Sequence, residues 1–315
     1  MPEIRPTRDD AELERWLALR NEFVPDDAVS IENIRSWMEH SRQAHLLAFD
    51  DGELVAIGLG VKEAWLSKPM VRPLVQPSHR RRGIGSALLA ELSRWAASEG
   101  SEELLVDVQL GDEESLGFAE RRGFVEIGRE LKVALDLMGE LLTIDPPAGV
   151  EVVTWAERPE LVDGLYEVYR EGTVDIPSEE EIDVPSLEDW LASDMTGDGD
   201  RPEWTFVAVA GDEVVGYSKW SLTSAQPTTA HHDLTAVRRT WRGRGIAGAL
   251  KSAQLAWAKE NGYTRAVTNN EERNVPIRRL NERFGYRPAG GRILMRGPLF
   301  SPAGRPGGRP DRAAS

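Results

Sequence analysis

Two short stretches rich in arginine and glycine have residue types suited to phosphate binding. They read Arg80-Arg81-Arg82-Gly83-Ile84-Gly85-Ser86 and Arg242-Gly243-Arg244-Gly245-Ile246-Ala247-Gly248. Glycine lets a backbone adopt positive φ and approach an oxyanion closely. A helix N-terminus adds unpaired N–H groups and roughly half a positive charge, and arginine side chains can meet further phosphate oxygens. The stretches therefore predict phosphate-binding loops that lead into helices, although neither has the spacing of a dinucleotide fingerprint or a P-loop.

The two stretches belong to an internal repeat with one fixed offset of 162 residues. The same offset carries Val75 onto Val237, Leu88 onto Leu250, Trp95 onto Trp257, and Gly123-Phe124 onto Gly285-Tyr286. This period is far longer than the roughly 20–50 residues of solenoid repeats. A duplicated domain of ordinary size is the economical explanation, and the length of 315 residues agrees with it.

Each copy predicts the same order of elements. Two helices come first, near 10–20 and 31–39 or near 158–170 and 186–193, and a hairpin follows over 46–60 or 206–220. Next come a strand ending at Val75 or Val237, the Arg/Gly loop, and an amphipathic helix ended by Gly100 or Gly262. A strand, a short helix and a final strand complete each copy, which predicts an α/β fold with a mixed sheet.

Prolines and a glycine near 140–150 predict a boundary between domains 1–145 and 146–300. The Gly-, Pro- and Arg-rich tail, 301–315, is expected to be disordered.

Composition narrows the class of protein. The chain has no cysteine, which excludes disulfides and Cys-ligated zinc, and we expect no metal site. No apolar run approaches the ~18–20 residues of a membrane helix, and the N-terminus lacks a secretory apolar segment. The net charge of −15 disfavours nucleic acid and anionic membranes; it would attract a cationic substrate, or it is simply a solvated surface. A cytoplasmic protein is the simplest interpretation.

Both copies resemble the GCN5-related N-acetyltransferase (GNAT) superfamily. The second copy carries the resemblance over its whole core: Thr235-Ala236-Val237, Trp241 to Ala247, Ala249-Leu250-Lys251, Thr268-Asn269-Asn270, Asn274, and Leu280-Asn281 before Gly285-Tyr286. The first copy keeps the loop and Gly123-Phe124 and is otherwise more divergent. The resemblance covers roughly residues 5–140 and 150–298. It implies two tandem GNAT-like domains, each with a mixed, mostly antiparallel sheet flanked by helices.

The resemblance also implies acetyl-CoA as cofactor, with CoA as product. The pyrophosphate is expected on backbone amides of 81–86 and 243–248, and the pantetheine arm along 73–75 and 235–237. Asn274 matches a family Asn that contacts the cofactor, whereas the first copy has Asp112 there. The implied cofactor-binding residues are Leu74, Val75, Arg80, Arg81, Arg82, Gly83, Ile84, Gly85, Ser86, Thr235, Ala236, Val237, Arg242, Gly243, Arg244, Gly245, Ile246, Ala247, Gly248 and Asn274.

A base must take a proton from an amine before it attacks a thioester. The family often places a carboxylate four residues before the last strand valine, which is Asp233 in the second copy and Val71 in the first. Asp233 could equally be a local structural carboxylate, and His231 or His232 is an alternative base. Strand alternation predicts Asp233, Thr235 and Val237 on one face and His232 on the other.

The usual family acid is a tyrosine, but its positions hold Ala119 and Asn281. Tyr217 could reach the site, although a packing role is equally compatible, and Tyr286 is expected in the core.

These patterns predict an N-acetyltransferase that acts on a primary amine of a small, cationic acceptor, with the second copy as catalyst. The alternative is an acetyl-CoA-binding pseudoenzyme that senses or scaffolds. A cluster of acidic residues before the second copy's core either borders the acceptor pocket or is solvated: Glu179, Glu180, Glu181, Asp183, Glu188 and Asp189. A monomer and a homodimer are both compatible with two fused copies.

Overall fold

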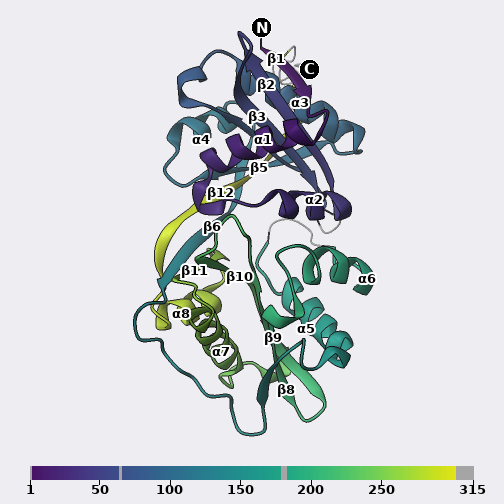
Figure 1. The fold of residues 1–315 in the computed structure, drawn as a ribbon. Coiled ribbons are helices and arrows are strands. Elements are labelled where there is room, and N and C mark those ends of the chain that lie inside the picture. The colour runs from purple at the N-terminus through teal and green to yellow at the C-terminus, as the bar shows by residue number, and fades with distance from the viewer. Residues whose placement is uncertain (1, 64–65, 179–182, 303–315) are drawn as a thin grey trace, which may run out of the picture.

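The computed structural model describes residues 2–63, 66–178 and 183–302. They form two α/β halves that share one 12-stranded sheet (Figure 1). The strand order is β1-β2-β3-β4-β5-β12-β6-β11-β10-β9-β8-β7.

The first half contains β1 (Glu3–Pro6), α1 (Asp10–Phe23), α2 (Ile31–His40), β2 (Arg42–Asp50), β3 (Glu53–Lys62), β4 (Met70–Val75), α3 (Ile84–Ser98), β5 (Glu103–Gln109), α4 (Glu113–Glu120) and β6 (Val125–Asp136). The second half contains β7 (Glu151–Thr154), α5 (Val162–Val174), α6 (Leu187–Trp190), β8 (Thr205–Ala210), β9 (Glu213–Ser221), β10 (Thr229–Val237), α7 (Ile246–Glu260), β11 (Arg265–Glu271), α8 (Val275–Arg283) and β12 (Arg287–Pro298). The tandem α/β fold class is confirmed. The elements follow the predicted order, except that a short strand, β1 or β7, precedes the two helices of each half.

Local signals set the ends of several elements. Both predicted strands end where expected, β4 at Val75 and β10 at Val237. Gly100 and Gly262 follow α3 and α7 with φ of 79° and 86°, the left-handed conformation that suits a residue just past a helix end. The helix predicted over 186–193 is shorter than expected, because α6 passes into a π-helical turn, Leu191–Met195.

Helices cover both faces of the sheet in each half. In the first half, α3 buries Leu88 and Leu92 against one face, and Trp16 of α1 packs with Leu47 and Ile57 on the other. In the second half, α7 and α5 take the corresponding places, around Leu250 and Leu165. The residues on the two faces alternate along the strands, as the period of a strand requires.

The final strand of each half is exchanged with the other half. β12, near the C-terminus, pairs with β5 of the first half, and β6 pairs with β11 of the second half. β6 and β12 also pair with each other and form the centre of the sheet, where Figure 1 shows them crossing between the halves. The sequence predicted a final strand in each copy but held no signal for the partner of that strand.

The link between the halves lies against the second half. Ile144 donates its backbone N–H to Ser252 Oγ at 3.0 Å, and its side chain packs on Gly248 of α7. The predicted limits 1–145 and 146–300 meet in this link, outside any helix or strand, and they stay a prediction. Nearly all of the tail 301–315 lies outside the described residues.

Candidate active site

The two Arg/Gly loops have the same backbone geometry. Gly83 and Gly245 are the N-caps of α3 and α7, with φ of 84° and 88°. Two residues earlier, Arg81 and Gly243 also have positive φ, 63° and 76°. In the described chain no side chain caps either helix, so the first N–H groups of both helices are available to an anion.

The first arginine of each loop folds back onto the preceding strand. Arg80 Nε donates to the carbonyl oxygen of Val75 at 3.4 Å, and Arg242 Nε donates to that of Val237 at 2.9 Å. These side chains therefore tie each loop to its strand. Arg242 also forms an ion pair of 2.6 Å with Asp175, which follows α5 and is contacted by Arg239 as well. Hydrogen bonds from Arg239 lower the pKa of Asp175 to about 2, so this carboxylate stays ionised beside the second loop.

Beside each loop, a parallel strand pair opens. β4 and β5 pair only at Met70 and Leu105, and the strands separate beyond that point. β10 and β11 pair as far as His232 and Thr268 and then separate. Strand edges opened in this way offer backbone donors and acceptors to an extended ligand.

A cavity of about 760 Å³ begins at the loop of the first half and runs to the middle of the molecule. Its wall at the loop includes Arg81, Gly83, Gly85 and Ser86, and it continues along Val71 to Val75 on β4. From the second half it reaches residues 221–223, 226 and 231–233 but none of the loop 242–248. The open path from a phosphate loop to the interior thus belongs to the first half.

Equivalent residues of the two halves face this one cavity. The 162-residue offset relates Val71 to Asp233, Val106 to Thr268, and Asp107 to Asn269, and all six line the cavity. The interior part of the cavity, which we call the central chamber, therefore lies between the inner ends of the two strand openings. Substitutions in either half can alter it.

Asp233 lines the central chamber and is held by a buried lysine. Lys219 Nζ lies 3.0 Å from Asp233 Oδ2, and it also contacts Asp194 and Asp200. Burial lowers the pKa of Lys219, but the three carboxylates outweigh burial and raise it, so the ammonium persists. Burial raises the pKa of Asp200 to about 7. The Asp233 side chain is 43% exposed and so remains reachable from the chamber.

The strand alternation predicted for β10 is wrong at one point. A bulge between His232 and Thr235 shifts the register against β9, and it brings His232 Nε2 to 2.6 Å from Thr235 Oγ1. Thr235 thus shares the side of His232 rather than that of Asp233. A single extra residue reverses the alternation.

The two histidines have different surroundings. His232 is buried, with Nε2 also 3.0 Å from Ser218 Oγ and Nδ1 3.1 Å from Lys251 Nζ, so protein groups occupy both ring nitrogens. His231 lines the chamber, and its Nε2 has no hydrogen-bond partner in the described structure. Burial lowers the pKa of His231 to about 4, which leaves the ring neutral at neutral pH. Asp233 and His231 are therefore the two reachable candidate bases.

Asp112 and Asn274 lie at the N-termini of α4 and α8, and Asn281 lies within α8. Asp112 caps α4 through the N–H and hydroxyl of Ser115, at 3.0 and 2.7 Å. Asn274 precedes α8 without a side-chain cap bond. Asn281 is buried and donates to Asn270 Oδ1 at 2.9 Å.

The tyrosines and the acidic cluster also have defined places. Tyr217 and Tyr286 are buried in the two cores of the second half, and their hydroxyls have no partner in the described structure. Glu179 to Glu181 lie outside the described residues, and Asp183, Glu188 and Asp189 are exposed.

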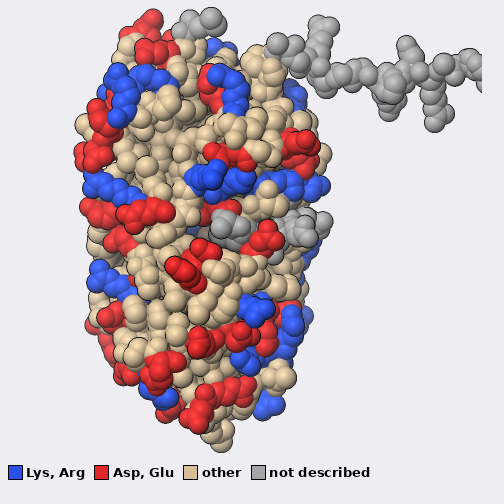
Figure 2. Space-filling model, turned by 90° about the vertical axis from the view of Figure 1, so that its right-hand side faces the viewer, with Lys and Arg blue, Asp and Glu red and all other residues tan. Residues whose placement is uncertain are grey.

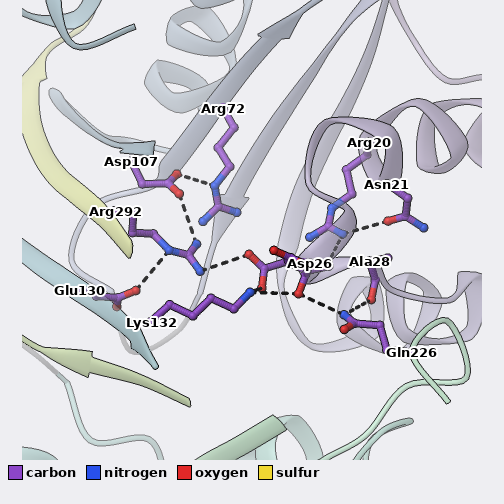
Figure 3. A network of polar contacts seen from close by, with 11 residues as sticks. Arg20, Asn21, Asp26, Ala28, Arg72, Asp107, Glu130, Lys132, Gln226 and Arg292 are labelled. Carbon is purple, nitrogen blue, oxygen red and sulfur yellow. Dashed lines mark hydrogen bonds and ion pairs between the residues drawn. The ribbon is translucent and has the colours of Figure 1, made fainter. Parts of the chain in front are cut away.

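Sequence reasoning missed a charged network at the inner end of the cavity (Figure 3). Its members come from different elements, among them the exchanged strands: Arg20, Asp27, Arg72, Asp107, Lys132 and Arg292. On the outside, acidic and basic side chains are interspersed over the face drawn in Figure 2. The described helices include none that is long and apolar enough to cross a membrane.

Two α/β halves, each with an opened strand pair and a glycine-capped helix, define a tandem acyltransferase architecture. The acetyltransferase (GNAT) family model matches residues 11–124 and 162–286. The chain belongs to the GNAT family and is an acyltransferase.

Similar proteins support the same family. A mycothiol acetyltransferase of Brachybacterium faecium is 27% identical over 234 residues, which cover 72% of this chain and 67% of that protein. An aminoglycoside N(6')-acetyltransferase type 1 of Acinetobacter haemolyticus is 24% identical over 41% of this chain and 98% of its own.

Solved structures share the tandem fold. A GCN5-related N-acetyltransferase from Sphaerobacter thermophilus matches with a TM-score of 0.75 and 22% identity, over 95% of this chain and 96% of its own. A tandem GNAT protein from the clavulanic acid biosynthesis pathway matches with a TM-score of 0.74 and 19% identity, over 96% and 99%.

Proposed function

We propose that this acyltransferase moves the acetyl group of acetyl-CoA to a primary amine of a small acceptor in the central chamber. The observation that carries the proposal is the continuous cavity from the loop of the first half to Asp233. The mycothiol and aminoglycoside acetyltransferases named above act on small molecules by their names, which agrees with an enclosed chamber.

The residues around the first loop fit the cofactor. The uncapped N-terminus of α3 and the positive φ of Gly83 suit a pyrophosphate, with Arg81 and Arg82 beside it. The exposed backbone edge of Leu74 and Val75 would hold the pantetheine arm. Acetyl-CoA supplies an activated thioester when bound, and a backbone N–H on β4 would stabilise the oxyanion that forms.

Asp233 is the proposed base of the reaction. An amine of pKa about 10 is protonated at neutral pH, and it must lose that proton, directly or through water, before it attacks. Asp233 reaches the chamber and is fixed by Lys219, whereas the equivalent Val71 accepts no proton.

The division of labour that we propose differs from the one the sequence favoured. Sequence patterns predicted cofactor-binding residues in both halves and placed the chemistry in the second, with the first half holding a cofactor structurally or without turnover. The cavity instead supports cofactor binding in the first half, with Asp233 contributed by the second. A carboxylate lies beside each loop, Asp175 at Arg242 and Glu114 at Arg80 and Arg81, so the proposal depends on the cavity and not on these charges.

Acetyl-CoA should raise the Tm of the protein and release thiol in the presence of a suitable amine. A ligand at roughly a hundred times its Kd stabilises the native state by about 2.7 kcal/mol. Thermal unfolding and a colorimetric thiol assay with a panel of small amines would measure the two effects. S-acetylpantetheine, which lacks the pyrophosphate, serves as the control and should shift Tm much less.

Two outcomes would count against the proposal. Equal Tm shifts by the two thioesters would remove the role of the loop. A Tm shift by acetyl-CoA without thiol release from any amine would favour the pseudoenzyme alternative.

A further inference from the structure

Four cationic side chains meet at the inner end of the cavity. Arg20 comes from α1, Arg72 from β4, Lys132 from β6 and Arg292 from β12, and Figure 3 shows them converging. Arg20, Arg72 and Arg292 line the cavity itself. Strand exchange is what brings Lys132 and Arg292 beside the others.

The nearby carboxylates are already shared among these cations. Asp107 lies between Arg72 Nε at 2.5 Å and Arg292 Nη1 at 3.2 Å. Asp27 lies 2.6 Å from Lys132 Nζ and 3.8 Å from Arg292 Nη2. Burial raises the pKa of Asp107, but the two guanidiniums outweigh burial and lower it, so Asp107 remains an anion.

Of these four cations, Arg20 forms no ion pair with any carboxylate that the structure describes, although Asp27 and Asp107 lie near enough to act on its charge. Its Nη1 donates to Asn21 Oδ1 at 2.9 Å and to the backbone oxygen of Asp27. Its Nε and Nη2 form no hydrogen bond or ion pair with any residue that the structure describes. Burial, and after it the neighbouring Arg72, lowers the pKa of Arg20 to about 10, although Asp27 acts in the opposite direction, so the guanidinium stays charged at neutral pH.

Arg72 also has N–H groups that form no hydrogen bond within the described chain. It uses only Nε for Asp107, and within the described chain its two terminal nitrogens have no partner. A charge withdrawn from water is costly unless it is paired. Two neighbouring guanidiniums with unused N–H groups at a cavity wall are therefore suited to an anion that arrives with a ligand.

We propose that Arg20 and Arg72 bind a carboxylate of the acceptor, so that the acceptor is an amino acid or a similar amino-carboxylic acid. This proposal rests on the proposed function, since the carboxylate belongs to the molecule that is acetylated. The planar fork of arginine matches the two oxygens of a carboxylate. The overall charge of −15 indicated either a cationic acceptor or simply a solvated surface, whereas the wall of the chamber selects for an acceptor that also carries a negative group.

Binding of reaction products tests the subsite without turnover. The probes are the N-acetyl derivatives of the common amino acids and the corresponding primary amides, titrated by calorimetry. We expect at least one acid to bind the wild-type protein ten or more times more tightly than its amide. Arg20→Gln should remove most of that difference, because it deletes a charge-assisted contact, and it should leave the amide unaffected.

The control variant is Arg15→Gln. Arg15 lies on the same helix, is exposed and does not line the cavity, so it loses the same charge without touching the chamber. It should bind the acid as the wild type does. Arg20→Lys keeps the charge and loses the fork, so its loss should be intermediate, and it also serves if Arg20→Gln fails to fold.

Thiol release separates this subsite from the proposed function. If β-alanine is acetylated and 2-aminoethyl phosphate is not, the anion is a carboxylate; the reverse would overturn the choice of carboxylate. If no amine releases thiol but acid binding still depends on Arg20, the proposed function fails and the subsite stands. Equal binding of acids and amides by the wild type, or equal losses in Arg15→Gln and Arg20→Gln, would overturn the subsite.

Discussion

Gly83→Val should lower the affinity for acetyl-CoA at least tenfold and remove most acetyl transfer, whereas Gly245→Val should change both far less. A β-branched side chain at the start of α3 would stand between the helix N–H groups and the pyrophosphate. The cavity that we assign to the cofactor includes Gly83 and does not include Gly245. Calorimetric titration with acetyl-CoA and the thiol assay would measure the two effects.

The two glycines make a matched pair. Their φ values are 84° and 88°, and a Cβ on either would have no neighbour within 4 Å. Both substitutions therefore carry the same backbone strain, about 1–2 kcal/mol for a side chain in the left-handed region. Urea unfolding should show equal losses of stability. If Gly245→Val removes activity and Gly83→Val does not, the acetyl-CoA that reacts binds to the second half, which the sequence favoured as the catalyst.

Asp233→Asn should lower kcat/KM by about 10²–10⁴ at neutral pH, the usual contribution of a general base. The loss should shrink as pH rises toward the pKa of the acceptor amine, because the fraction of neutral amine grows roughly tenfold per pH unit below that pKa. Asparagine has nearly the same shape, and Lys219 keeps its contacts with Asp194 and Asp200. A pH profile of kcat/KM for both proteins would measure the effect.

His231→Gln is the companion variant, because His231 is the other candidate base in the chamber. It should keep most of the activity. A full loss in His231→Gln with no loss in Asp233→Asn would transfer the role of base to the histidine. A pH-independent loss in Asp233→Asn would indicate that the carboxylate positions the acceptor instead.

Local patterns predicted the elements well because local physics decides them. Val75 and Val237 end their strands as predicted. Gly100 and Gly262 follow their helices because glycine adopts positive φ without steric cost. The Arg/Gly loops were found in the same way. The sequence also predicted an acidic residue on β10 near the site, which lies in the chamber wall.

Local sequence patterns could not predict features that depend on contacts with other parts of the chain. The alternation along β10 fails because one bulge separates His232 from Thr235, and nothing in the local period signals an extra residue. Arg80 also makes a contact that local patterns did not predict, because its Nε donates to the preceding strand, while its part in cofactor binding stays a prediction. The charged network escaped notice because Arg20 and Arg292 are brought together only by strand exchange.

The exchange of β6 and β12 gives the chain the connectivity of two identical subunits that complete each other's sheets and were then joined end to end. Separate subunits would meet at a rate set by their concentration, whereas a covalent link raises the effective concentration of the partner to roughly the millimolar range. A symmetric pair of identical chains must present the same residue from both sides of a shared chamber. One fused chain escapes that constraint, and here it places valine at 71 and aspartate at 233. Fusion thereby permits one copy to specialise in holding a cofactor while its sister supplies the proton acceptor.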